Sequence, residues 1–353
     1  MVDHDNRSKR GLRMKYKIGI LGGGNISKTH LRAAREIAAL EVTGVCGSNH
    51  ERVKALADSA GVPAFTDEAI FFEECPMDIV AIGSPSGCHA DQGISAASRG
   101  IHILVEKPLD VSVEQADRLI NACRDAGVKL GIFFQDRFSP GAQELKSLVD
   151  GKKLGRPLLA TAHVKWYREP EYYSQSRWRG TWSLDGGGAV MNQGIHTVDL
   201  LIWLLGRPRQ VFGYARTSLH DIETEDTAVA VIEFESGALA TYEATTAAFP
   251  GQPRKIFLTG SKGTASLVHD RISALSLLGE EQEDTGEQGP DSAENTSSPT
   301  VSDVSGHRKV MEDFIEAIEQ DRPPMCDGPD ARRSVELVQA IYESSRTGKP
   351  VDI

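Results

Sequence analysis

An apolar strand that runs directly into a glycine turn and a helix most constrains the fold of this chain. Residues Tyr16 to Leu21 form the apolar run, three glycines follow, and a helical pattern continues to Glu36. In that setting a glycine turn lets the backbone approach a phosphate at the N-terminus of the helix. Ser27 replaces the third glycine of the usual pattern and is small enough for close packing. The sequence therefore predicts a dinucleotide-binding turn made by Gly22, Gly24, Asn25 and Ile26.

The same strand-then-helix order repeats through the first 138 residues. Apolar runs predict further strands at 40–46, 78–82, 101–105 and 129–134, with helical patterns between them. Such alternation predicts an α/β fold with a parallel, doubly wound sheet, in which ligands bind at the carboxyl ends of the strands. The loops after these strands should therefore share one edge with the glycine turn.

Lys107 is the leading candidate for chemistry at that edge. It lies in Glu106-Lys107-Pro108, directly after the strand that ends at Val105. A lysine whose pKa is tuned by burial and by neighbours can exchange a proton during a redox reaction. Glu106 is placed to orient either this lysine or a cofactor. A solvated charge pair that closes the strand is the alternative, and the shared edge argues against it.

The end of the second strand bears on the choice between NAD and NADP. An NAD site usually has an acid there to bind the ribose 2′-hydroxyl. Gly47 occupies that place, and Ser48, Asn49 and Arg52 follow it with groups that can donate to a 2′-phosphate. The sequence slightly favours NADP, although an ordinary turn with a solvated Arg52 fits nearly as well.

The pattern changes after Pro140, where one helix leads into longer strands. Alternating residues predict strands at 158–165, 210–218, 227–235, 238–246, 255–260 and 263–268. These describe a mostly antiparallel sheet with one covered face and one free face, and a free face suits a homodimer or homotetramer interface. Residues 279–306 are rich in polar and acidic residues and predict a flexible loop, and two helices at 309–320 and 330–347 close the chain.

A second polar group lies in the latter half. Asn192, His196 and Asp199 are spaced i, i+4 and i+7, which would put them on one face of a helix. The preceding glycines 186–188 would let the backbone approach a ligand. His196 can pass a proton near neutral pH, although a structural histidine bonded to Asp199 is the alternative. One histidine and one acid are too few for a metal site, so none is predicted.

Overall charge and cysteine usage exclude several classes of function. The net charge of −11 argues against broad nucleic-acid or membrane-surface binding. The five cysteines are scattered without a paired spacing, which predicts free thiols in a cytoplasmic protein. Residues 1–14 are polar and basic and predict a disordered arm rather than a secretory signal.

Together these residues resemble the Gfo/Idh/MocA family, the glucose–fructose oxidoreductase and inositol dehydrogenase group. The resemblance runs from Tyr16 over essentially the whole chain. It rests on the glycine turn, on Glu106-Lys107-Pro108 and on the Gly-Gly-Gly…His…Asp helix, together with Ser84, Pro85, His89, Arg137, Trp178 and Arg179. It implies a Rossmann domain, here 15–138, and an α/β domain with a large open sheet, here 139–353.

The resemblance also implies the activity, which is NAD(P)-dependent hydride transfer at a hydroxyl or ketone carbon of a sugar or cyclitol. Lys107, often followed by a cis peptide bond, and His196 would be the catalytic residues. Cofactor contacts are expected from the glycine turn and from Ser48, Asn49, Arg52, Ser84, Pro85, His89, Glu106, Lys107, Arg137, Trp178 and Arg179. Besides Lys107 and His196, substrate contacts are expected from Asn192, Tyr167, Arg168 and Tyr173.

One position departs from the family pattern. Many relatives have an aspartate four residues before the histidine, where this chain has Asn192. An amide can bind a sugar hydroxyl but cannot accept its proton, so proton transfer falls to His196 or Lys107. Two alternatives stay open: a glycoside hydrolase or epimerase that retains its nicotinamide, and a non-catalytic NAD(P)-binding sensor.

Overall fold

The computed structural model describes residues 15–280 and 303–353. The two segments expected to be flexible, 1–14 and 279–306, therefore lie largely outside the described residues. Ser305 and Gly306, at the end of the second segment, belong to a helix rather than to a loop. Within the described ranges no helix combines the length and apolar character needed to cross a bilayer.

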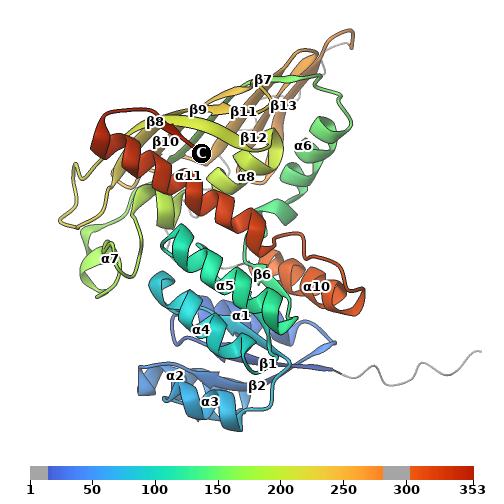
Figure 1. Ribbon diagram of the computed structural model, residues 1–353, viewed down its shortest axis with the longest axis vertical. Coiled ribbons are helices and arrows are strands. Elements are labelled where there is room, and N and C mark those ends of the chain that lie inside the picture. Colours follow the sequence, from blue (N-terminus) through green and yellow to red (C-terminus); the bar gives the residue numbers. More distant parts are fainter. Residues whose placement is uncertain (1–14, 281–302) are drawn as a thin grey trace, which may run out of the picture.

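A parallel sheet of six strands forms the first half of the molecule (Figure 1). Its order is β3-β2-β1-β4-β5-β6. Strands β2 and β3 therefore lie on one side of β1, and β4, β5 and β6 lie on the other, as in the predicted doubly wound fold. The strands are β1 (Tyr16–Leu21), β2 (Leu40–Cys46), β3 (Ala64–Phe65), β4 (Ile79–Ile82), β5 (His102–Val105) and β6 (Leu130–Ile132). Every residue of β4 and β6 is buried, because helices cover both faces.

Helices and turns connect these strands. The helices are α1 (Asn25–Arg35), α2 (His50–Ala60), α3 (Glu68–Glu74), α4 (His89–Ala97) and α5 (Val113–Ala126), with tight turns η1 (Ser86–Cys88) and η2 (Gln135–Phe138). Helix α10 (Ser305–Glu319) returns from the far end of the chain and packs on α1. Its Phe314 fills the space over Gly131, where a Cβ would lie 2.7 Å from the ring. This packing brings the N-terminus of α10 to the edge of the parallel sheet.

The second half is built on a sheet of eight strands in the order β13-β12-β11-β7-β10-β9-β8-β14. The sheet is mostly antiparallel, as predicted, and β7 and β10 form its one parallel pair. The sequence patterns did not predict β13 and β14, because the first lacks alternation and the second is very short. The strands are β7 (Pro157–Lys165), β8 (Pro208–Arg216), β9 (Thr227–Phe234), β10 (Leu239–Thr245), β11 (Lys255–Gly260), β12 (Gly263–Val268), β13 (Arg271–Leu277) and β14 (Val351–Asp352).

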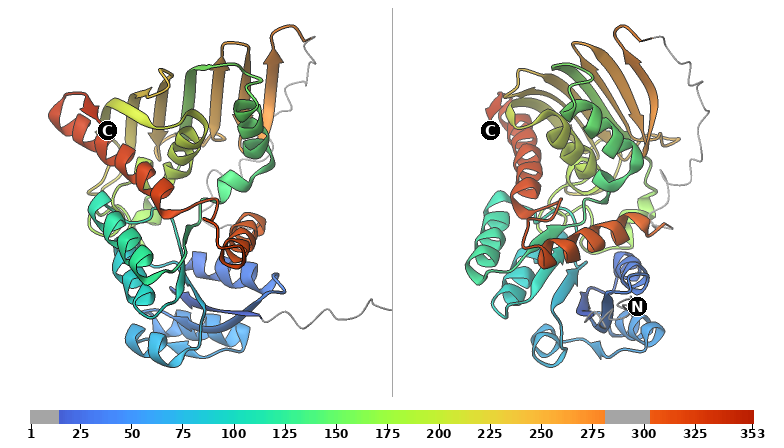
Figure 2. Two further views of the ribbon diagram at one scale, coloured as in Figure 1. Left: turned by 45° about the vertical axis from the view of Figure 1, so that its right-hand side comes forward. Right: turned by 90° about the vertical axis from the view of Figure 1, so that its right-hand side faces the viewer.

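Among the described residues, helices cover one face of this sheet and leave the other free (Figure 2). The covering helices are α6 (Pro140–Asp150), α8 (Ile195–Leu205) and α11 (Gly328–Thr347), and a short helix, α7 (Pro170–Ser174), follows β7. Burial alternates along β9, so Val229 and Val231 are exposed on the opposite face. The predicted contrast between a covered and a free face is therefore confirmed.

Candidate active site

A cavity of about 2930 Å³ lies at the carboxyl edge of the parallel sheet and is lined from both halves of the chain. It brings together nearly all the residues that the sequence marked as site candidates. Lining it are Gly22, Gly24, Asn25, Ile26, Ser48, Asn49, Arg52, Ser84, Pro85, His89, Glu106, Lys107, Arg168, Trp178, Arg179, Asn192 and His196. Arg137, Tyr167 and Tyr173 are not among its lining residues.

The glycine turn has the shape that a dinucleotide requires. Gly24 precedes α1, and no side chain caps the helix there, so backbone N–H groups remain available at its N-terminus. A Cβ on Gly24 would meet nothing within 4 Å, which leaves the approach open. Gly22 has φ of +135°, and a Cβ there would lie 2.6 Å from Oγ of the fully buried Ser27. The residues of this turn therefore fit a diphosphate.

The end of β2 leaves little room for an acidic side chain. A Cβ on Gly47 would lie 3.0 Å from Val53 and 3.1 Å from the backbone N of Gly23. The side chain of Asn49 caps α2 by accepting a hydrogen bond from the backbone N of Arg52, at 3.0 Å. This cap holds the start of α2 at the cavity wall.

Lys107 reaches across the cavity from the end of β5. Its peptide bond to Pro108 is cis, and its Nζ donates to the backbone O of Asn192 at 2.8 Å. Burial lowers the pKa of Lys107, and the charges of Arg168 and Arg179 act in the same direction. The ammonium is thus partly buried and linked to the second half of the chain.

Glu106 is enclosed by two imidazoles behind the lysine. Its Oε1 lies 2.8 Å from Nε2 of His30 and 3.4 Å from Nε2 of His307, which stands on α10. Burial alone would raise the pKa of Glu106, but these two contacts hold it well below its usual range. The three ligand atoms lie within 4.8 Å of one another, a grouping that the sequence did not predict. The contacts with His30 and His307 are sufficient to stabilise the buried carboxylate of Glu106 without a metal ion.

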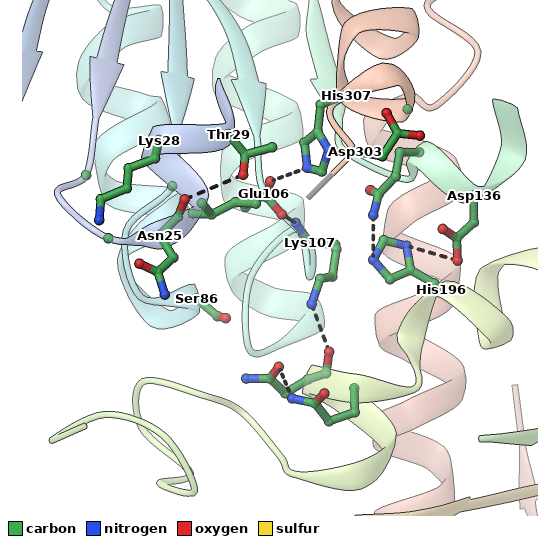
Figure 3. A pocket seen from close by; sticks show the side chains of 18 of the residues that line it. Asn25, Lys28, Thr29, Ser86, Glu106, Lys107, Asp136, His196, Asp303 and His307 are labelled. Carbon is green, nitrogen blue, oxygen red and sulfur yellow. Dashed lines mark hydrogen bonds and ion pairs between the residues drawn. The ribbon is translucent and has the colours of Figure 1, made fainter. Parts of the chain in front are cut away.

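His196 stands at the first turn of α8 and faces the cavity that Lys107 enters (Figure 3). Its Nε2 lies 3.4 Å from the amide nitrogen of Gln135, and its Nδ1 lies 3.8 Å from Oδ2 of Asp136. Burial lowers the pKa of His196 well below 6.5, and the charge of Lys107 adds to the effect. The imidazole is therefore neutral at neutral pH and able to accept a proton.

The expected stripe of Asn192, His196 and Asp199 on one regular helix is wrong. A π-helical turn over Ala189–Gln193 precedes α8 and changes the spacing. The amide of Asn192 donates to Asp185, and only its backbone O binds Lys107. Asp199 turns into the core, away from the cavity, and does not bond to His196.

Arg137 also lies in the core, contrary to the expected cofactor contact. Its guanidinium pairs with Asp199 and with Asp330 of α11, and it is only 1% exposed. A buried guanidinium needs carboxylate partners, and these two residues supply them. Arg137 therefore joins the two halves of the molecule beneath the cavity.

The sequence suggested that glycines 186–188 let the backbone approach a ligand, but none of them lines the cavity. A Cβ on Gly188 would collide with the backbone O of Glu225, and one on Gly187 with the hydroxyl of Tyr342. The Glu225 carboxylate accepts from the backbone N of Gly188 and of Val190. These glycines allow close packing of the chain against itself.

Three further candidates have structural contacts. Tyr173 is buried and pairs its hydroxyl with Thr246, while Tyr167 packs edge-on against Phe249 away from the cavity. His89 lines the cavity, but Nδ1 and Nε2 of its ring lie against the backbone O atoms of Pro108 and Ser84, at 2.9 and 3.1 Å. His89 thus braces two edge loops.

Tyr172 and Gln193 line the cavity but were missed by the sequence analysis. The guanidinium of Arg179 stacks on Tyr172 at 4.1 Å from the ring centroid, and Gln193 donates to the hydroxyl of Tyr172 at 2.9 Å. Asp185, beside the cavity wall, accepts from Asn192, and burial raises its pKa to about 6. No spacing in the sequence marks Tyr172 or Gln193, because they become neighbours only in the fold, 21 positions apart in sequence.

Comparison with known proteins connects this geometry to a family. The model described as "Oxidoreductase family, NAD-binding Rossmann fold" matches residues 16–134. The model described as "Oxidoreductase family, C-terminal alpha/beta domain", named GFO_IDH_MocA_C, matches residues 146–353. The two matches together cover nearly all of the chain.

Individual relatives match over almost their full length. D-xylose 1-dehydrogenase (NADP(+)) 2 of Haloferax volcanii is 28% identical over 95% of this chain and 99% of its own. The WlbA dehydrogenase of Bordetella pertussis, solved in complex with NADH and UDP-GlcNAcA, is 31% identical over 96% of this chain and 99% of its own, with a TM-score of 0.85. Its counterpart from Chromobacterium violaceum, solved in the same complex, is 29% identical over 97% of each chain, with a TM-score of 0.85.

Proposed function

The chain belongs to the Gfo/Idh/MocA oxidoreductase family, and on this basis we propose that Lys107 and His196 are the catalytic residues of an NAD(P)-dependent sugar or cyclitol dehydrogenase. The observation that carries the proposal is the cavity that these two residues share. It is continuous with the glycine turn, so a single space accommodates both a dinucleotide and a substrate.

The chain's own groups have distinct roles in this reaction. When bound, the nicotinamide supplies or accepts the hydride. The neutral imidazole of His196 accepts the proton of the substrate hydroxyl during oxidation and returns it during reduction. The ammonium of Lys107 donates a hydrogen bond to the same oxygen and stabilises the negative charge that develops there. Asn192 contributes its backbone O, which orients the ammonium.

The glycine turn would hold the cofactor diphosphate through Gly22, Gly24, Asn25 and Ile26. We assign the adenosine ribose to Ser48, Asn49 and Arg52, which favours NADP because Gly47, and not an acid, stands directly after β2. Ser84, Pro85, Glu106 and Trp178 complete the expected cofactor surface along the sheet edge. The relatives' substrates make D-xylose and UDP-linked sugars the first compounds to screen.

The experiment that tests this function replaces Lys107 by Met. Loss of the ammonium should lower kcat by about 10²- to 10⁴-fold while the Kd of NADPH stays within about twofold. The matched control is Lys54→Met, an exposed lysine on α2 outside the cavity, which should retain wild-type turnover. Unchanged kcat in Lys107→Met would remove this residue from the mechanism. Product formation without net change in cofactor absorbance would instead identify a hydrolase or epimerase.

We also propose a homo-oligomer assembled through the free face of the second sheet, where apolar side chains are exposed. All five cysteines are free thiols, which is typical of a reducing compartment, so the proposal assigns the enzyme to the cytoplasm.

A further inference from the structure

We propose that the substrate carries an anionic group, carboxylate or phosphate, and that Arg168 and Arg179 bind it beside the reacting carbon. This inference rests on the proposed dehydrogenase function and specifies its substrate class. It reassigns Arg179, which the sequence analysis gave to the cofactor, to the substrate.

The two arginines form one basic wall of the cavity. Arg168 follows β7 and Arg179 follows α7, and both guanidiniums contact the ring of Tyr172, at 5.4 and 4.1 Å from its centroid. Arg168 is only 5% exposed, and both residues line the same cavity as Lys107. Guanidiniums stacked on a shared aromatic ring present their planar N–H forks to a ligand in a fixed orientation.

This wall is tied directly to the catalytic lysine. Arg168 donates from Nη2 to the side-chain O of Gln193 at 2.8 Å, and the preceding residue, Asn192, accepts from Lys107 at 2.8 Å. Gln193 and Asn192, which are consecutive in sequence, therefore connect the basic wall with Lys107, the group proposed to donate to the substrate oxygen. An anion held by the arginines would lie next to the reacting carbon.

The local charge balance calls for an anion. Within the described residues neither Arg179 nor Lys107 forms an ion pair with a carboxylate, and Nε of Arg179 is buried without a hydrogen-bond partner. Glu106 and Asp185 are the acids that act on Lys107, and Asp185 also acts on Arg179, but the oxygens of Asp185 already accept from Gly180 and Asn192. A carboxylate or phosphate would give Arg179 the charged partner that it lacks among the described residues, whereas a neutral sugar would not.

The test compares charged and neutral sugars on the NADPH-loaded enzyme by titration calorimetry. Glucuronic acid is compared with glucose, and UDP-glucuronic acid with UDP-glucose. If the arginines bind a carboxylate, we expect glucuronic acid to bind about 10- to 100-fold more tightly than glucose, and if they bind the diphosphate, we expect both UDP-sugars to bind about 10- to 100-fold more tightly than glucose, the range of a charge-assisted hydrogen bond. Preference for glucuronic acid over glucose identifies the anion as a carboxylate. Equal, strong binding of both UDP-sugars beside weak binding of both free sugars identifies it as the diphosphate.

Arg179→Gln provides the decisive variant, with the exposed neighbour Arg177→Gln as its matched control. The first should reduce the preference for the anion to about twofold, and the second should preserve it. Arg179→Lys, which keeps the charge but loses the fork, should fall between them. If glucuronic acid and both UDP-sugars bind the wild type no more tightly than glucose, the proposal is overturned, as it would be by weaker NADPH binding in Arg179→Gln with unchanged sugar preference. Turnover is measured separately with NADP as hydride acceptor, and selective binding of the anion without reduction of NADP by any of these sugars would count against the dehydrogenase function but leave this inference intact.

Discussion

The guanidinium of Arg137 and the carboxylate of Asp199 form a bidentate ion pair, with N–O distances of 2.7 and 2.8 Å and almost no exposure to solvent. The pair joins η2, at the edge of the parallel sheet, to α8, which carries His196. Asp330 of α11 adds a third charge at 2.8 Å. A charge network beneath the cavity thus joins the side that carries His196 to the parallel sheet, in addition to the contact of Lys107 with Asn192 inside the cavity.

Removing one member of this pair should strongly destabilise the protein. Asp199→Asn leaves a buried guanidinium with only part of its charge compensated, and we expect a loss of about 3–5 kcal/mol in the free energy of unfolding. The comparison is Asp58→Asn, in the exposed pair with Lys54, where about 0.5 kcal/mol or less is expected. Urea unfolding followed by circular dichroism measures both. A similar stability in the two variants would contradict a structural role for Asp199.

Protonation of His196 should set the acid limb of the pH profile. Burial, followed by the charge of Lys107, lowers the pKa of this histidine well below 6.5, so its neutral form persists into mildly acidic solution. The value of kcat/KM should therefore fall only at a pH well below 6.5. The pKa of Lys107 is also lowered, so the alkaline limb should begin below 10.5. An acid limb at or above 6.5 would rule out the buried imidazole as the base.

The same lowered pKa links folding stability to pH. The unfolded chain binds a proton at His196 near pH 6.5, whereas the folded protein binds it only at lower pH, so the unfolded state holds more protons in between. Stability should consequently fall as pH drops through that window. Buried His30 and His89, whose pKa values are also lowered, act in the same direction. Urea midpoints at each pH separate this effect from the loss of catalysis.

Local patterns in the sequence predicted the strands and the sheet edge well, for physical reasons. The bounds of β1, β2, β11 and β12 match the predicted ones, because apolar runs and alternation directly reflect burial. Lys107 was found because the carboxyl ends of parallel strands share one edge. The partners of Arg137 were not found, because they lie 62 and 193 positions away in sequence. The glycines 186–188 indicated a close approach without identifying what approaches, which proved to be Glu225 and Tyr342.

Arg52 should determine the preference for NADP. Its backbone is fixed by the cap from Asn49, and Gly47 stands directly after β2 where an NAD site usually has an acid. We expect tighter binding of NADP than of NAD, and Arg52→Gln should weaken NADP binding by about tenfold while changing NAD binding by less than about twofold. Fluorescence titration of both reduced cofactors measures this, with Lys54→Gln as the control for a charge lost elsewhere on α2. Equal losses for both cofactors would place Arg52 outside the 2′-phosphate site.

The free face of the second sheet should be an interface between copies of this chain. Val231 is 55% exposed there and lies directly opposite Phe212 of β8, and Val229 lies opposite Tyr214, so apolar pairs continue across neighbouring strands. Val231→Glu places a charge in this apolar surface and should convert the oligomer to monomers at micromolar concentration, as measured by light scattering after gel filtration. The matched control is Ile70→Glu, an exposed apolar residue on α3 in the other half of the molecule, which should leave the mass unchanged. Because Val231 is already exposed in a single chain, its replacement should cost the monomer little stability, so a loss of assembly with retained circular dichroism would reflect the interface alone. A wild-type protein that is monomeric, or a Val231→Glu variant with the wild-type mass, would show that this face does not mediate assembly.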